Sequence, residues 1–383
     1  MARLQQISVC ILIVLSSYYP RLTVSQSTVS YLPGFSGPLP FRLETGYVGV
    51  GDLEEHQLFY YFVESEKSPK EDPLVLWLLG GPGCSGWSAL VYEIGPLYFE
   101  NVPYNGSLPT LKLREHSWTK ISNIIFVDSP VWTGFSYSSG SKDYLGGDIK
   151  SSKEVHQFLR KSTKKSCRGD YTKPSNFKCS MDLEAVNKCI AGIYTDHILE
   201  PNCPLASPKP KDTVGHGRSL KENSRELLLP DPLPTFGCRG YWYLLSYYWA
   251  DDASVRKALH IREGTVGEWL RCNRELAYVQ DVNSSVKYHL NLTTRGYRAL
   301  IYSGDHSLSI SFVGTETWIR SLNFSIVDDW RPWAVDGQVA GYTRTYSNDF
   351  TFATVKGAGH TAPEYKPKEC FAMLHRWISH NPL

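Results

Sequence analysis

Runs of apolar residues along the chain predict buried β-strands. Three of them lack polar alternation, which is typical of strands covered on both faces of a sheet. A fourth run is rich in β-branched and aromatic residues, which favour strands. The four predicted strands are PLVLWLL before Gly80, NIIFVD before Ser129, RALIYS before Gly304 and FTFATVK before Gly357.

Between these strands, apolar residues recur at helical spacing. The predicted helices are SKEVHQFLRK at 152–161, DASVRKALHI at 252–261 and TETWIRSL at 315–322. Asp251 or Asp252 is placed to cap the second helix. Strands that alternate with helices predict a doubly wound α/β sheet, whose ligands bind beyond the carboxyl ends of the strands.

The composition is that of a globular protein with material for one large core. The chain of 383 residues is 42% hydrophobic and 20% charged, with a formal net charge of +2. No stripe of lysine and arginine stands out, so nucleic acid is not an expected partner. The densest basic stretch, at 161–168, is short and is interpreted as a solvated turn.

The N-terminus has a basic start, an apolar run and a small polar exit, which predicts a cleaved signal peptide over residues 1–26. The apolar run Ile7–Leu15 is about half the length that spans a bilayer, so no membrane anchor is expected. A secreted chain, extracellular or vacuolar, also fits the glycosylation sequons. The predicted glycosylation sites are Asn105, Asn283, Asn291 and Asn323.

Eight of the nine cysteines remain once Cys10 leaves with the signal peptide. No Cys-x-x-Cys spacing is present, so we expect neither a zinc site nor a redox motif, and no metal or cofactor. In an oxidising compartment the default for these cysteines is disulfide formation. Residues 204–237 are rich in proline, lysine and serine, which predicts a flexible surface loop open to proteolysis.

Candidate chemistry follows the predicted strands. The turn from Gly80 to Gly86 lets backbone N–H groups approach a reacting carbonyl, as in one arm of an oxyanion hole, although a plain strand-to-helix turn explains the glycines equally well. Asp305 and His360 each follow a strand. Alone, each has a structural explanation as turn former or core histidine. Together they match the Ser…Asp…His order of an α/β-hydrolase triad.

Several sequence blocks resemble the serine carboxypeptidase family, most closely its plant serine carboxypeptidase-like branch. That branch includes acyltransferases that use glucose esters as acyl donors. The blocks occur in family order and span nearly the whole mature chain. They are GGPGCS at 80–85, YEIGP at 92–96, VDSPVWTGFSY at 127–137, IYSGDH at 301–306 and GHTAPEYKP at 359–367.

The resemblance implies an α/β-hydrolase-type mixed sheet with a lid insertion. It places Asp305 and His360 as the acid and base of the triad, and Gly81 as a donor of the oxyanion hole. Glu93 would belong to an acidic pair that holds a substrate carboxylate. Complete relatives would act on small-molecule esters or on peptides. The oligomeric state is not predicted.

The same resemblance implies a division of the chain and a set of disulfides. After the signal peptide, residues 27–166 and 251–383 would form the two parts of the hydrolase domain, and residues 167–250 a disulfide-stapled lid. Cys189 and Cys370 would stay free. The implied disulfides are Cys84–Cys272, Cys167–Cys179 and Cys203–Cys238.

One block of the family pattern is missing. The family's nucleophile lies in a G-[DE]-S-Y-[SA]-G elbow, and this sextet does not occur in the chain. The nearest segment, GGDIKSS at 146–152, is interpreted as a loop and helix cap, which makes Ser151 and Ser152 poor substitutes. The interval from Pro130 to Cys167 is also too short for a further βαβ unit of about 30 residues or more.

The missing block therefore falls at about Lys161–Ser166 and removes the nucleophile strand with its helix. Because that strand is normally central, we expect its neighbours to expose unpaired edges and apolar faces. Without the serine, His360 has no hydroxyl to deprotonate and no acyl-enzyme can form. An alternatively spliced or mis-assembled product is one origin of such a chain.

Two substitutions bear on the substrate class. Leu79 stands where the peptidase pattern has an asparagine that binds a C-terminal carboxylate, so peptide C-termini are disfavoured. Trp132 replaces a glycine. It either narrows the pocket or stacks on an aromatic acyl group, or it merely covers surface. The alternatives for the whole chain are a family member that has lost its nucleophile, a non-catalytic protein that binds a ligand or partner, and an unstable truncated product.

Overall fold

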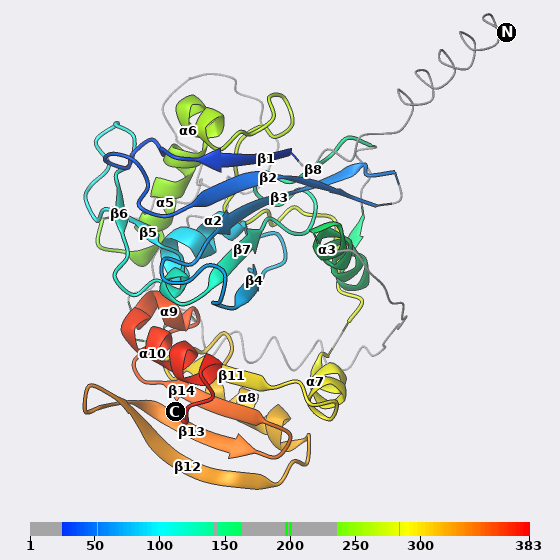
Figure 1. Ribbon diagram of the computed structural model, residues 1–383, viewed down its shortest axis with the longest axis vertical. Coiled ribbons are helices and arrows are strands. Elements are labelled where there is room, and N and C mark those ends of the chain that lie inside the picture. Colours follow the sequence, from blue (N-terminus) through cyan, green and yellow to red (C-terminus); the bar gives the residue numbers. More distant parts are fainter. Residues whose placement is uncertain are drawn as a thin grey trace, which may run out of the picture.

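The computed structural model describes most of the chain beyond its N-terminus (Figure 1). Residues 1–24, which hold nearly all of the predicted signal peptide, lie outside the described part. The first described strand begins at Ser25, one residue before the predicted end of that peptide. The described residues are 25–51, 53–140, 145–162, 196–197, 199–200, 236–282 and 284–383.

The larger sheet lies in the upper part of Figure 1 and has the strand order β1-β2-β3-β7-β4. Its strands pair antiparallel from β1 to β7, whereas β4 pairs parallel with β7. The short strand β8 pairs with β3. The bounds are β1 Ser25–Val29, β2 Leu43–Val50, β3 His56–Val63, β4 Leu74–Leu78, β7 Asn123–Val127 and β8 Tyr137–Ser138.

A second sheet lies in the lower part of Figure 1, in the order β11-β14-β13-β12. Its first pair is parallel and the others are antiparallel. The bounds are β11 Ala299–Gly304, β12 Ile326–Val335, β13 Gln338–Tyr346 and β14 Phe350–Val355. Short ladders join β5 (Leu97–Phe99) to β6 (Leu111–Leu113) and β9 (Gly146–Gly147) to β10 (Tyr278–Val279).

The four predicted strands correspond to β4, β7, β11 and β14, and the three predicted helices lie at α3, α6 and α8. Asp252 caps α6 by accepting from the backbone N–H groups of Ser254 and Val255. The bounds are α2 Gly86–Ser88, π-helical η1 Ala89–Glu93, 3₁₀ turn η2 Trp118–Lys120, α3 Asp148–Ser162, α5 Arg239–Ala250, α6 Ala253–Ala258, α7 Val286–Thr293, α8 Phe312–Arg320, α9 Ala362–Tyr365 and α10 Pro367–Ile378.

The sheet is divided where the central strand was expected to be missing. Among the described residues, β4 is an edge of the larger sheet and β11 is an edge of the second. Leu74 and Leu78, at the ends of β4, are 60% and 50% exposed. A strand of only apolar residues is usually covered by neighbours, because an open apolar edge invites pairing with other chains. The expected exposure of edge and apolar face is thus confirmed.

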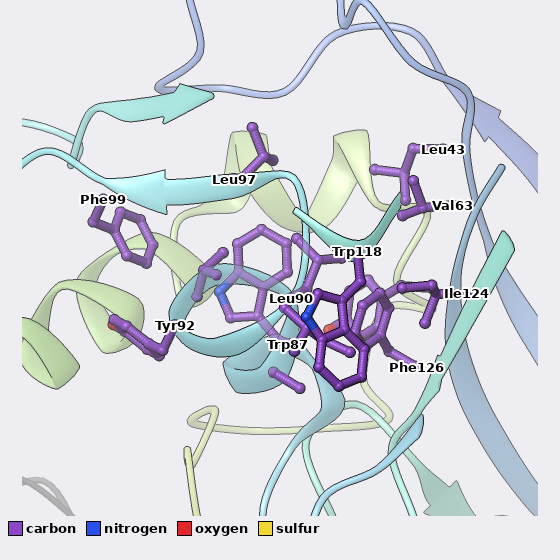
Figure 2. Packing of buried hydrophobic residues seen from close by; sticks show 14 of the residues in the cluster. Leu43, Val63, Trp87, Leu90, Tyr92, Leu97, Phe99, Trp118, Ile124 and Phe126 are labelled. Carbon is purple, nitrogen blue, oxygen red and sulfur yellow. The ribbon is translucent and has the colours of Figure 1, made fainter. Parts of the chain in front are cut away.

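One hydrophobic core nevertheless joins the two sheets. Phe126 of β7 and Val355 of β14 belong to the same buried cluster, with α9 and η1 in contact between the sheets. Figure 2 shows the part of the cluster around Trp87 of α2. The indole of Trp87 stacks on Trp249 of α5 at 4.2 Å between ring centroids and 1° between ring planes. These contacts fix the turn that follows β4.

The segment GGDIKSS was predicted to be a loop and a helix cap. In the structure it forms the short strand β9 and the first residues of α3. The helix begins at Asp148, four residues earlier than its predicted first residue. The Asp148 carboxylate accepts from the Tyr278 hydroxyl at 2.9 Å and from the Val282 N–H at 2.9 Å. Ser151 and Ser152 therefore lie inside a helix and not at the apex of a strand-to-helix elbow.

Candidate functional site

The turn after β4 is fixed by a disulfide and by a strap from the second half of the chain. Cys84 is bonded to Cys272, as the resemblance implied. The Asn273 N–H donates to the Gly83 carbonyl at 2.9 Å, and the Ser85 N–H donates to the Arg271 carbonyl at 2.8 Å. Gly83 has a φ of 97°, and a Cβ there would lie 2.6 Å from the Asn273 carbonyl. Only glycine fits this close approach.

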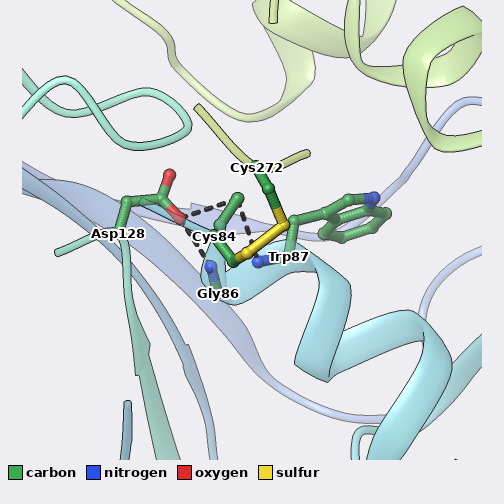
Figure 3. Close-up of a disulfide and its surroundings, with 6 residues drawn as sticks. Cys84, Gly86, Trp87, Asp128 and Cys272 are labelled. Carbon is green, nitrogen blue, oxygen red and sulfur yellow. Dashed lines mark hydrogen bonds between the residues drawn. A yellow bond between two sulfur atoms is a disulfide. The ribbon is translucent and has the colours of Figure 1, made fainter. Parts of the chain in front are cut away.

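A buried carboxylate anchors the same turn to β7 (Figure 3). Asp128 follows β7, and its Oδ1 accepts from the Ser85 hydroxyl at 2.7 Å and from the Gly86 N–H at 2.8 Å. Its Oδ2 accepts from the Phe135 N–H at 2.8 Å. Burial raises the pKa of Asp128 to about 6, although the three donors favour the charged form. Gly134 lies against this carboxylate, where a Cβ would come within 2.2 Å of Oδ2.

The residues predicted to shape the substrate pocket lie on either side of this anchor. Gly81 is exposed and lies between the carboxyl end of β4 and the disulfide. Leu79 is half-buried and packs against the main core cluster. Trp132 is half-buried, contacts two core clusters and has a φ of 69°, where a side chain is strained. Its carbonyl accepts from the Asn273 amide at 3.0 Å.

Glu93 ends η1 and is buried, with 7% of its surface exposed. Burial raises the pKa of Glu93 to about 7, and the negative charge of Glu364 adds to the shift. Glu364 belongs to α9 and accepts from Tyr243 at 2.9 Å and from Arg239 at 3.1 Å. The carboxylate that acts on Glu93 here is thus that of Glu364, for which no role was predicted.

Replacing Glu93 with glutamine is expected to stabilise the protein at alkaline pH. Because its pKa is raised by folding, the folded state binds the proton more tightly than the unfolded chain does. Stability is therefore greatest below the unfolded pKa near 4.5 and falls as the pH rises through 7. At pH 8, Glu93→Gln should raise the free energy of unfolding by about 2 kcal/mol. Urea unfolding at several pH values measures this change.

The exposed Glu263 offers a matched control for that measurement. Glu263→Gln should leave the pH dependence of stability as it is in the unaltered chain. If Glu93→Gln keeps the same fall in stability between pH 5 and pH 8, the carboxyl of Glu93 is not its source.

Asp305 lies where the sequence placed it, directly after β11. Its Oδ1 accepts from the Gly357 N–H at 2.7 Å and lies 3.8 Å from Nε2 of His306. The bond to Gly357 ties the end of β11 to the loop that follows β14. The imidazole within 4 Å of this carboxylate is therefore that of His306, the next residue in the chain.

His360 lies at the carboxyl end of the neighbouring strand, β14, with an exposed side chain. Its backbone N–H donates to the Asp196 carbonyl at 2.7 Å. Within the described residues, no hydrogen bond joins its imidazole to Asp305 or to a serine hydroxyl. The structure brings the predicted acid and base to one edge of the second sheet but does not join them.

A surface cavity of about 740 Å³ lies at the other end of the larger sheet. Its lining includes Leu74 and Asn123, which are the first residues of β4 and β7. Since ligand sites of α/β sheets lie beyond the carboxyl ends of the strands, this cavity is separate from the candidate site.

Of the helices in the described part of the chain, none has both the length and the hydropathy of a membrane span. Across the same residues, no three histidine, cysteine, aspartate or glutamate side chains are grouped as metal ligands.

The other predicted positions are the cysteines and the glycosylation sites. Cys238 is disulfide-bonded, but its implied partner Cys203 lies outside the described residues, as do Cys167, Cys179 and Cys189. Cys370 is free and buried. Asn105, Asn291 and Asn323 are exposed, whereas Asn283 lies outside the described residues. Glycosylation at these positions, and the implied lid at 167–250 with its loop at 204–237, stay predictions.

The sheet order and the loops at its carboxyl edge define an α/β-hydrolase protein. A structural neighbour supports this class: Kex1Δp, a prohormone-processing carboxypeptidase from Saccharomyces cerevisiae, superposes with a TM-score of 0.62. The match covers 92% of this chain and 95% of that one at 16% sequence identity. The sequence profile of the serine carboxypeptidases matches residues 33–165 and 159–380, so the chain belongs to the serine carboxypeptidase family.

Plant relatives agree over nearly their full lengths. The chain is 40% identical to Serine carboxypeptidase-like 17 of Arabidopsis thaliana, with 95% of each chain covered. It is 42% identical to Serine carboxypeptidase-like 7 of the same plant, with 98% of each covered.

The same comparisons locate the missing block. The two alignments extend over 446 and 432 residues, more than the 383 of the chain, so these relatives contain residues with no counterpart here. The family profile matches in two separate segments, 33–165 and 159–380, which overlap at 159–165. This break coincides with the block predicted to be missing at about Lys161–Ser166.

Proposed function

We propose that this chain is a catalytically silent serine carboxypeptidase-like glycoprotein of the secretory pathway. The observation that carries the proposal is the absence of a nucleophile elbow from the sequence, at the point where the family match breaks. In a triad the imidazole acts by removing a proton from the nucleophile, so a base without a hydroxyl supplies no covalent catalysis. Complete relatives, in this proposal, carry out peptide hydrolysis or acyl transfer from glucose esters through a serine triad.

The surroundings of the two retained triad positions support this proposal. The Asp305 carboxylate accepts a hydrogen bond from the Gly357 N–H and lies beside His306. The His360 side chain is exposed. Ser152, one of the serines nearest to the missing elbow, donates its hydroxyl to the Asp148 carbonyl at 2.7 Å. A hydroxyl held by its own helix in this way is not presented to an imidazole.

The ancestral substrate class in this proposal is an ester rather than a peptide. Leu79 presents an apolar side chain where a donor for a C-terminal carboxylate would be needed. Trp132 adds a large aromatic surface to the same end of the sheet, suited to an aromatic acyl group. Both substitutions favour the acyltransferase-like branch of the family.

A serine-directed fluorophosphonate probe tests the proposal. We expect no labelling above the background of the heat-denatured chain, because such probes react with an activated serine and not with ordinary hydroxyls. A complete serine carboxypeptidase-like relative, labelled in parallel, is the positive control. Labelling of one site per molecule would overturn the proposal, and mass spectrometry of the adduct would then identify the serine.

A further inference from the structure

Two histidines from distant parts of the chain face each other beside the candidate site. Nδ1 of His306 lies 3.3 Å from Nε2 of His197, within hydrogen-bonding distance. The two rings are nearly perpendicular, at 89°, with 4.9 Å between their centroids. His197 is 8% exposed and stacks on the ring of Tyr365 in α9. An imidazole pair this close shares one hydrogen between two nitrogens.

The residues around His197 hold the loop of His360. The Asp196 carbonyl accepts from the His360 N–H at 2.7 Å. The Asp196 carboxylate accepts from the Ser309 hydroxyl at 2.7 Å, and Glu200 pairs with Arg239 at 2.7 Å. We refer to Asp196, His197 and Glu200 as the latch residues. Asp196 and His197 contact residues that follow β11 and β14, where the two predicted triad positions lie, and Glu200 is held by α5.

The proton count decides whether the two imidazoles attract or repel each other. With both rings neutral, or with one proton added, one nitrogen donates to the other. With both rings charged, each facing nitrogen carries a hydrogen and neither can accept. The second nitrogen of His197, Nδ1, is buried and has no hydrogen-bond partner among the described residues. In the singly charged pair this nitrogen already carries a hydrogen, because only one of the three hydrogens lies between the facing nitrogens. A second added proton must therefore enter between the two rings, where it removes the acceptor of their hydrogen bond.

Charged groups lie on both sides of the pair. On one side, the Asp305 carboxylate lies 3.8 Å from Nε2 of His306. On the other side, Tyr365 separates His197 from Arg239, whose guanidinium lies 3.8 Å from the ring centroid. Arg239 is in turn paired with Glu200 and with Glu364. The carboxylate of Asp196 is the remaining charge on the latch residues.

We propose that the His197–His306 pair is an acid-sensitive latch that holds the latch residues against the His360 loop. Histidine is the side chain whose charge ordinarily changes between pH 5 and pH 8. Acidification charges the second ring, the two imidazoles repel each other, and Asp196 withdraws from the His360 N–H. The latch releases that loop in acid and holds it at neutral pH, with or without a nucleophile in the chain.

Hydrogen–deuterium exchange of the full mature chain at pH 7.5 and pH 5.0 tests the latch. After correction for the intrinsic effect of pH on exchange, the His360 amide should exchange at least about tenfold faster at pH 5.0, the loss expected when one hydrogen bond opens. Amides of β2, within Leu43–Val50, should stay protected at both pH values. Unchanged protection of His360, or an equal loss of protection in β2, would overturn the proposal.

Two variants make the test specific. In His197→Gln the side-chain amide can donate or accept at any pH, so protection of His360 should persist at pH 5.0. Glu93 is unaltered in this variant, so its titration cannot explain a difference. In the control His156→Gln, which replaces an exposed histidine of α3, the tenfold change should remain. If His197→Gln loses protection in acid as the unaltered chain does, the imidazole pair is not the latch.

Discussion

Replacing Asp128 with alanine is expected to lower the free energy of unfolding by about 3–4 kcal/mol, because three buried donors would lose their acceptor. These donors are the Ser85 hydroxyl and the N–H groups of Gly86 and Phe135. Asp128→Asn keeps an oxygen for two of them and turns an N–H₂ group toward the third. Its loss should be smaller, about 1–2 kcal/mol. Denaturant unfolding at pH 7.5 measures both values.

Asp328→Ala is the matched control, since 43% of this side chain is exposed and it pairs with Arg331 at the surface. No measurable change in stability is expected there. If Asp128→Ala loses less than about 1 kcal/mol, the three donors find other acceptors and the carboxylate does not anchor the turn.

Restoring the missing block is expected to change both the sheet and the chemistry. A chimera would carry the corresponding strand, elbow and helix of a complete plant relative between Lys161 and Cys167. The new strand should pair with β4 and β11 and join the two sheets, because among the described residues both of these strands are sheet edges. Fluorophosphonate labelling should rise from background to one site per molecule. Ester hydrolysis should rise by at least about 10³-fold, the scale of a complete triad.

The elbow Ser→Ala version of the same chimera separates structure from catalysis. Compared with the present chain, it should have a higher free energy of unfolding and better protection of the β4 amides from exchange. It should show neither labelling nor hydrolysis. If the serine-containing chimera folds with β4 protected and still fails to label, then the present arrangement of Asp305 and His360 is itself defective.

Much of the fold could be predicted because single strands carry their own signal. The apolar runs that form β4, β7, β11 and β14 are typical of strands that are buried on both faces of a sheet. Such runs can be recognised from their own composition, without knowledge of the neighbouring strands. The unpaired edges could also be predicted, since they follow from a block that the chain lacks. The strand that begins at Leu74 thus keeps the sequence of an interior strand in an edge position.

Other features depend on contacts between distant residues. The hairpin of β12 and β13 turns at Asp336-Gly337, where both residues have positive φ, and this Asp-Gly pair was the local signal that could have revealed it. Asp128 lay inside a recognised block, but its role rests on Ser85, 43 residues earlier. The contact between His197 and His306 joins positions 109 residues apart, and no spacing rule predicts such a pair.

The Cys84–Cys272 bond has a consequence for the life of the molecule after synthesis. It joins positions that are 188 residues apart, one in each half of the chain. A protease that cuts anywhere between them produces two polypeptides that remain a single covalent particle. Such a particle would migrate as one band before reduction and as two afterwards, so an intact mass does not by itself demonstrate an intact backbone.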